Sequence, residues 1–213
     1  SKSNSGSVMI HSGKSEAGIS GSVEMKVGAA ESNKGGDILL AAGKSGSSVG
    51  GYIKLMSGGS QNGISGHVDI RSSSAGNAGS SGAVIIRSGT SNSGSSGSVA
   101  LESGTSDRGS SGNIFVNAGA GYLSGGNIGI SAGNSSISTG GHISISSGSS
   151  SSGSSGYLHF QTGASRNGRS SGSIHIQTGK SLSKHSGDIM LKTGGANVGE
   201  AGMVTISAGA GRA

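Results

Sequence analysis

A pair of aliphatic residues recurs along this chain at an interval of about 15 residues, and this repeat constrains the fold more than any other feature. The recurring motif reads Gly, any residue, aliphatic, any residue, aliphatic, any residue, small residue, Gly, as in GNIFVNAG at 112–119 and GSIHIQTG at 172–179. It occurs about fourteen times. A supersecondary unit repeated at a fixed period is typical of a solenoid, in which each repeat contacts only its neighbours.

Within each motif the aliphatic residues alternate with variable ones, which is the period of a β-strand with one buried face. Nearly all the alternating residues are β-branched or Leu, which favours a pleated surface. The predicted structural core consists of these residues: Val8, Ile10, Val23, Ile38, Leu40, Ile53, Leu55, Val68, Ile70, Val84, Ile86, Val99, Leu101, Ile114, Val116, Ile128, Ile130, Ile143, Ile145, Leu158, Phe160, Ile174, Ile176, Ile189, Leu191, Val204 and Ile206.

The pattern therefore predicts an all-β fold, a β-solenoid or β-helix of about fourteen 15-residue repeats spanning 1–213 as a single domain. The Gly- and Ser-rich linkers add a longer period, because every third linker shares its length and its Gly position (Gly18, Gly63, Gly109, Gly153, Gly199). Three repeats, or about 45 residues, would then form one three-sided coil. The alternative is one repeat per turn in a flat, two-sided solenoid.

Composition excludes several other classes of protein. The chain has 213 residues, of which 46 are Gly and 30% are hydrophobic, and it has no Pro, Cys or Trp. Without Cys there are no disulfides or thiolate sites, and without Pro there is no collagen helix. No stretch is apolar enough for a membrane span. Few aromatic residues with much Gly and Ser would suggest disorder, but the regular placement of the aliphatic residues argues against it.

No constellation of residues indicates catalysis or a cofactor. His159 and His175 occupy equivalent outward positions, and Glu24 and Asp69 could form a carboxylate pair between stacked coils, but exposed surface residues explain both better. Ser is too common for a Ser beside His to indicate a triad, and no phosphate-binding GxxxxGK[ST] occurs. The sequence predicts a protein that is not an enzyme and holds no cofactor or metal.

The net charge of +6 indicates either solubility or an anionic partner. Several cations lie in the linkers: Lys14, Lys44, Arg108, Arg166, Arg169, Lys180 and Lys184. An anionic polysaccharide or a mineral surface is a candidate partner. Nucleic acid is not expected, because aromatic residues are only 2% of the chain.

The motif and its SxxGxSG linkers resemble the long Gly/Ser-rich β-repeat proteins of cell surfaces and extracellular matrices in microalgae and bacteria. The resemblance implies a structural or adhesive role outside the cell, as a stiff solenoid spacer or filament. The chain begins and ends within the repeat, so we expect a fragment of a longer array or a filament subunit that associates end to end. Asn134 begins the single N-glycosylation sequon.

Two other functions fit a regular solenoid. One is ice binding, for which the Ser-rich linkers would supply a flat face, although Thr162, Thr178 and Thr193 are expected to point inward. The other is a polysaccharide-binding module of the kind found on phage tail spikes or cell surfaces.

Overall fold

The computed structural model describes residues 5–76, 79–166 and 169–211, and within these ranges the chain forms no helix and no β-strand. The prediction of an all-β solenoid is therefore wrong, both in its three-sided and in its two-sided form. The descriptions β-solenoid and β-helix do not apply. No helix of the described residues is long and apolar enough to cross a membrane.

The described ranges lack the backbone hydrogen bonds between repeats that a solenoid requires. Strands in a solenoid bond to the coils above and below at a spacing of about 4.8 Å. In the described ranges, backbone–backbone hydrogen bonds join residues at most eight positions apart, and none extends beyond one linker. Alternation determines which side chains can share a face but not whether two backbones pair. A chain this rich in Gly loses much conformational freedom on ordering, and two aliphatic side chains per repeat offset little of that loss.

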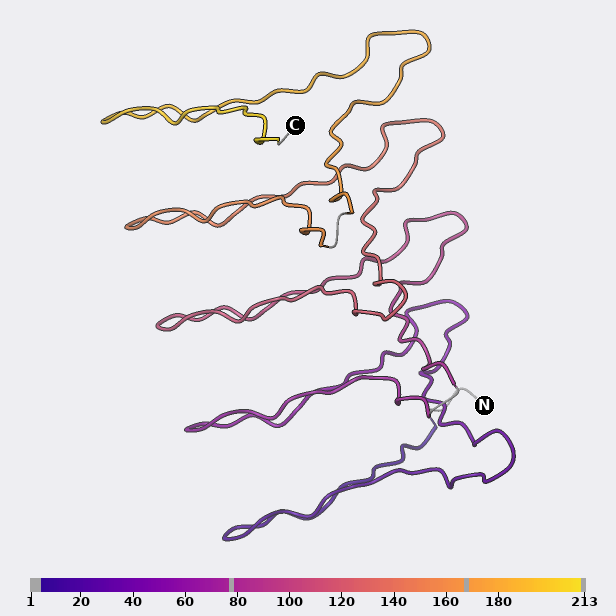
Figure 1. The fold of residues 1–213 in the computed structure, drawn as a ribbon. Coiled ribbons are helices and arrows are strands. Elements are labelled where there is room, and N and C mark those ends of the chain that lie inside the picture. Colours follow the sequence, from indigo (N-terminus) through magenta and orange to yellow (C-terminus); the bar gives the residue numbers. More distant parts are fainter. Residues whose placement is uncertain (1–4, 77–78, 167–168, 212–213) are drawn as a thin grey trace. The chain divides into compact units, whose positions relative to one another are not determined.

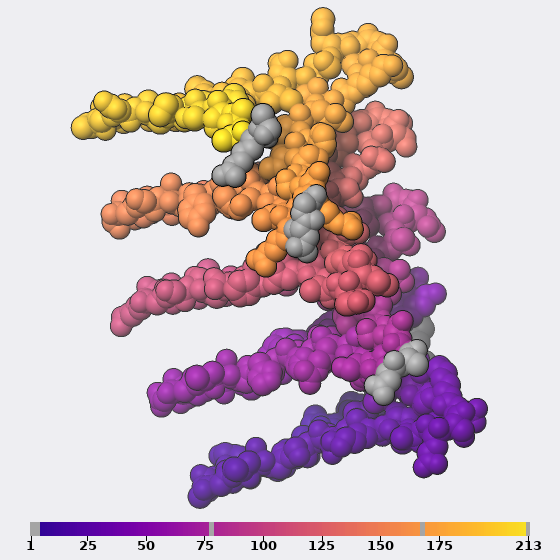
Figure 2. Space-filling model, in the orientation of Figure 1, coloured from indigo at the N-terminus to yellow at the C-terminus, as the bar shows by residue number. Residues whose placement is uncertain are grey.

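The chain divides into two units, Ser1–Gly112 and Asn113–Ala213. The boundary falls inside the motif at 112–119 and not in a linker. Within each unit the chain runs out and back in narrow arms that end in bends (Figure 1). The space-filling view shows how thin these arms are (Figure 2).

Each linker forms a loop, which we define as running from the closing Gly of one motif to the opening Gly of the next. The described loops bend near their middle. The bends lie at 16–18, 31–33, 46–48, 61–63, 92–94, 107–109, 122–123, 136–138, 151–153, 182–184 and 197–199. In five loops the amide of the opening Gly donates to the carbonyl of the closing Gly at 2.8–2.9 Å, as from Gly66 to Gly58. These bonds close the neck of the loop.

In most motifs the small residue lies at this neck, against the opening Gly of the next motif. A Cβ on Gly51 would lie 3.2 Å from the Cβ of Ala42, and one on Gly112 would lie 3.6 Å from that of Ser103. The neck is kept where the loop gains a residue, as before Gly82. The fixed Gly and small residue of the repeat are thus explained by close backbone approach.

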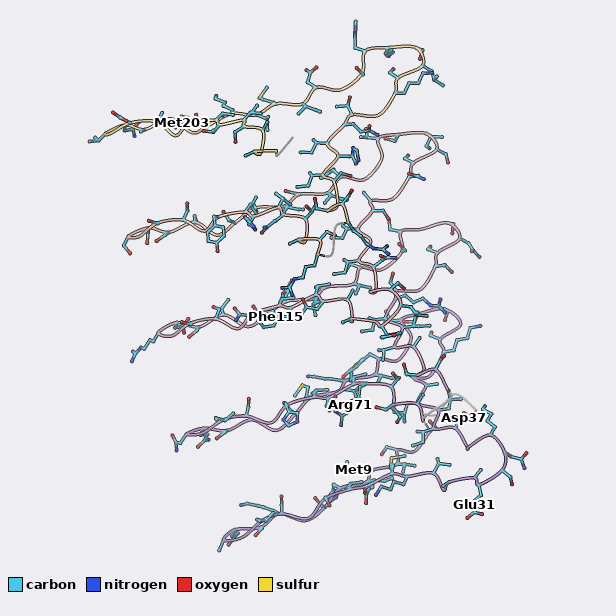
Figure 3. The ribbon with its side chains drawn as sticks, in the orientation of Figure 1. Met9, Glu31, Asp37, Arg71, Phe115 and Met203 are labelled. Atoms are coloured by element: carbon cyan, nitrogen blue, oxygen red, sulfur yellow. The ribbon has the colours of Figure 1, made fainter. Side chains whose placement is uncertain are left out.

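No described residue is buried, and every predicted core residue of the described ranges is exposed. The first aliphatic residue of most motifs is about half exposed, as Ile38 is at 53%, whereas the alternate residue Leu39 is at 88%. Phe115, an alternate residue labelled in Figure 3, is likewise more exposed than the first aliphatic residue of its motif, Ile114. The alternation therefore survives as a difference in exposure, without a packed core behind it.

The total accessible surface measures this lack of burial. It is 22096 Å², whereas a folded monomeric protein of the same mass, 20.2 kDa, exposes about 8,800 Å² and a fully unfolded one about 29,000 Å². The isolated chain thus keeps most of its apolar surface in contact with water.

Candidate functional site

The described residues form no pocket and no group of three or more His, Asp or Glu side chains that could hold a metal ion. The side chains of the described residues lie at the molecular surface, since none of these residues is buried. That surface has three components: the serine-capped loops, the charged side chains and the exposed aliphatic pairs.

A serine hydroxyl organises most of the loops. In eight of them, the Ser two positions after the closing Gly accepts a hydrogen bond from the backbone amide three residues later, as Ser60 does from Gly63 at 2.9 Å. This cap satisfies an amide at the bend in the way that a Ser at a helix N-terminus does. The eight cap residues are Ser15, Ser45, Ser60, Ser91, Ser106, Ser135, Ser150 and Ser181.

Sequence reasoning missed these caps. It treated the loop serines as interchangeable small residues, although a signal was present: Ser recurs at a fixed position after the closing Gly. The loop at 194–202 has Ala196 at that position and so has no hydroxyl to accept the bond. There Gly199 adopts a φ of 97°, a conformation open to Gly but strained for other residues.

The charged residues divide unequally between motifs and loops. The motifs contain five Lys and Arg and five Asp and Glu, so their formal charge is zero, and the whole net charge of +6 lies outside them. Within motifs, oppositely charged side chains two residues apart form ion pairs, Lys26 with Glu24 at 2.6 Å and Arg71 with Asp69 at 3.3 Å. Lys34, in a loop, pairs with Asp37 at 3.0 Å.

The two carboxylates considered for catalysis, Glu24 and Asp69, are the acids of these two motif pairs. Each has its own cation and is exposed, so each pair contributes little stability.

The remaining loop cations differ from these. Lys14, Lys44, Arg108, Arg166, Arg169, Lys180 and Lys184 form no ion pair within the described ranges, and all are exposed. The free positive charge of the described chain is therefore concentrated on its loops.

The two equivalent His residues make separate local contacts. Nε2 of His159 lies 2.9 Å from Oε1 of Gln161, and Nε2 of His175 lies 3.0 Å from Oγ of Ser173. Each contact is within the residue's own motif.

Asn134, the sequon residue, is exposed and lies in the loop 133–141, whose neck is closed by the bond from the Gly141 amide to the Gly133 carbonyl. The next residue, Ser135, is the cap of that loop. The sequon thus occupies an accessible and locally ordered turn.

Comparisons with known proteins give no relative of this chain: no family model, no curated protein and no solved structure matches it. Its function must be inferred from its own residues.

Proposed function

We propose that this chain is a non-catalytic structural or adhesive repeat protein of the cell surface or extracellular matrix, and that it acts by assembling with further copies of itself into a spacer or filament. One observation supports this most strongly: the aliphatic pairs are exposed at a regular spacing. Exposed apolar surface of this extent is typical of interaction sites or aggregation-prone chains.

A second copy is the partner that best fits this surface. The same motif recurs at about 15 residues along both chains, so side chains matched in one repeat stay matched in the next. The motifs have a formal charge of zero, so motifs of two copies do not repel each other through a net charge of their own. The absence of Cys suits a protein held together by non-covalent contacts.

Several motifs have an apolar residue beside the first aliphatic one, and three of them are used for a matched test. The test variant is I38S/I114S/I189S, and the control is L39S/F115S/M190S. The test residues are the less exposed set at 47–53%, against 78–88% for the control residues. Burial of one aliphatic side chain stabilises by about 1.5–3 kcal/mol. We therefore expect the test variant to raise the concentration required for assembly at least tenfold.

The measurement is sedimentation velocity over a range of protein concentrations, with electron microscopy of the assembled fraction. Ordered assemblies from the parent chain and the control, but not from the test variant at equal concentration, would support the proposal. A parent chain that stays monomeric at high concentration would refute it. Faceted ice crystals grown in its presence would then favour the ice-binding alternative.

A further inference from the structure

The strongest asymmetry of charge lies in the second half of the chain. From Arg108 to Gly187 there is no Asp or Glu, although five Lys and Arg residues occur there. Four of them lie in two successive loops of the second unit. We call these four residues the basic loop set: Arg166, Arg169, Lys180 and Lys184.

The residues of the basic loop set are exposed and have no ion pair among the described residues. Two cations of the first unit's motifs differ, since Lys26 and Arg71 each lie within 3.3 Å of a carboxylate. The nearest acid in the sequence, Asp188, follows the second loop and forms no ion pair with these cations among the described residues. Attraction to these four side chains would therefore be reduced mainly by solvent and salt.

The loops also supply neutral polar groups around these charges. Ser170, Ser171, Ser183 and Ser186 are exposed. Ser hydroxyls both donate and accept hydrogen bonds, which suits the hydroxyl groups of a sugar polymer. Arg presents a planar fork that binds sulfate or carboxylate with two hydrogen bonds.

Sugar polymers fit this surface better than nucleic acids do. Proteins that bind single-stranded nucleic acids combine positive charge with aromatic side chains on which the bases stack. Residues 163–187 include no Phe, Tyr or Trp. The four cations are also spread along two loops, which matches a linear polymer bearing charges at intervals better than a small compact anion.

We propose that the basic loop set binds linear anionic polysaccharide, and that this binding anchors the chain in a matrix. The inference rests on the proposed extracellular structural role, because that role brings the chain into contact with such polymers. It does not require the aliphatic pairs, which lie on the motifs and not on the loops.

The test measures binding of the whole chain to heparin, as a sulfated probe, and to polygalacturonate, as a carboxylated probe, with neutral dextran as the negative control. The test variant is R166Q/R169Q/K180Q/K184Q. The control variant is K26Q/K54Q/R71Q/R87Q, which removes the same charge from motifs of the first unit. At about 0.1 M NaCl, where exposed charges interact over about 10 Å, we expect at least tenfold weaker binding by the test variant. The control should lose threefold or less.

Three outcomes would overturn the inference. The first is an equal loss in both variants, which would show a response to net charge alone. The second is equal binding to neutral dextran. The third is tighter binding of a single-stranded DNA oligonucleotide than of either glycan. Sedimentation of the test variant without glycan separates the two proposals, because it should assemble as the parent chain does.

Discussion

At the scale of single residues, two positions of the repeat act within their own loop, the cap Ser and the opening Gly. The cap Ser satisfies a backbone amide at the bend, and the opening Gly allows the two ends of the loop to approach each other. Where the cap is replaced by Ala196, the loop instead contains Gly199 at a positive φ. The bend of this loop thus relies on the freedom of Gly, whereas the eight capped loops use a hydroxyl acceptor.

The cap can be tested in the loop 104–112, where the Gly109 amide donates to Oγ of Ser106 at 2.9 Å. Ser106→Ala removes the acceptor, at a cost of about 1 kcal/mol or less for an exposed bond. We expect the Gly109 amide to exchange with solvent up to about fivefold faster, measured by NMR on glycine-labelled protein. Ser110→Ala in the same loop is the control, and equal exchange in both variants would contradict the role of the cap.

At the scale of the element, the loops contain all the backbone–backbone hydrogen bonds of the described ranges, and the sequence predicts the limits of the loops. The Gly positions that bound each motif, and the small residue before the closing Gly, are the positions that form the necks. The predicted strands are wrong, because strand formation depends on pairing between distant segments, and the described ranges show no such pairing. An alternating pair such as Ile114 and Val116 indicates that the two side chains share a face. The pair does not specify which backbone segment would lie beside it, or in which register.

The sequence predicted which cations lie in the loops, but not which of them form ion pairs. The loop cations, including Arg166 and Lys180, could be assigned to loops from the spacing alone. Which cations are paired could not, because pairing depends on the rotamers of neighbours, as for Lys26 and Glu24. The serine caps required a distinction between loop positions that composition conceals.

The neck that is most sensitive to substitution is at Gly36, where the opposing motif residue is Val27 in place of a small one. A Cβ on Gly36 would lie 2.6 Å from Cγ1 of Val27, too close without a shift. Gly36→Ala should therefore open the loop 28–36, whereas Gly35→Ala should not, since a Cβ there meets nothing within 4 Å. Amide chemical shifts across 27–37 would measure this. Similar shifts in both variants would argue against a closed neck.

At the scale of the whole molecule, the two proposed interactions use different forces. Association of the aliphatic pairs would be hydrophobic, whereas retention by a polyanion would depend on the unpaired loop cations. Salt affects these in opposite directions, because it screens charges but a strongly excluded salt such as sulfate strengthens apolar burial. Self-association and glycan binding should therefore be separable in one protein by the choice of salt and temperature.

We expect ammonium sulfate, and warming from about 5 to 25 °C, to lower the protein concentration at which the chain assembles, because hydrophobic association weakens on cooling. Sodium chloride raised from about 0.1 to 0.5 M should release the chain from heparin, since the screening length falls over that range. Light scattering and column elution measure the two responses. Assembly that dissolves in sulfate would indicate contacts between charges, and the exposed aliphatic pairs would then need another partner.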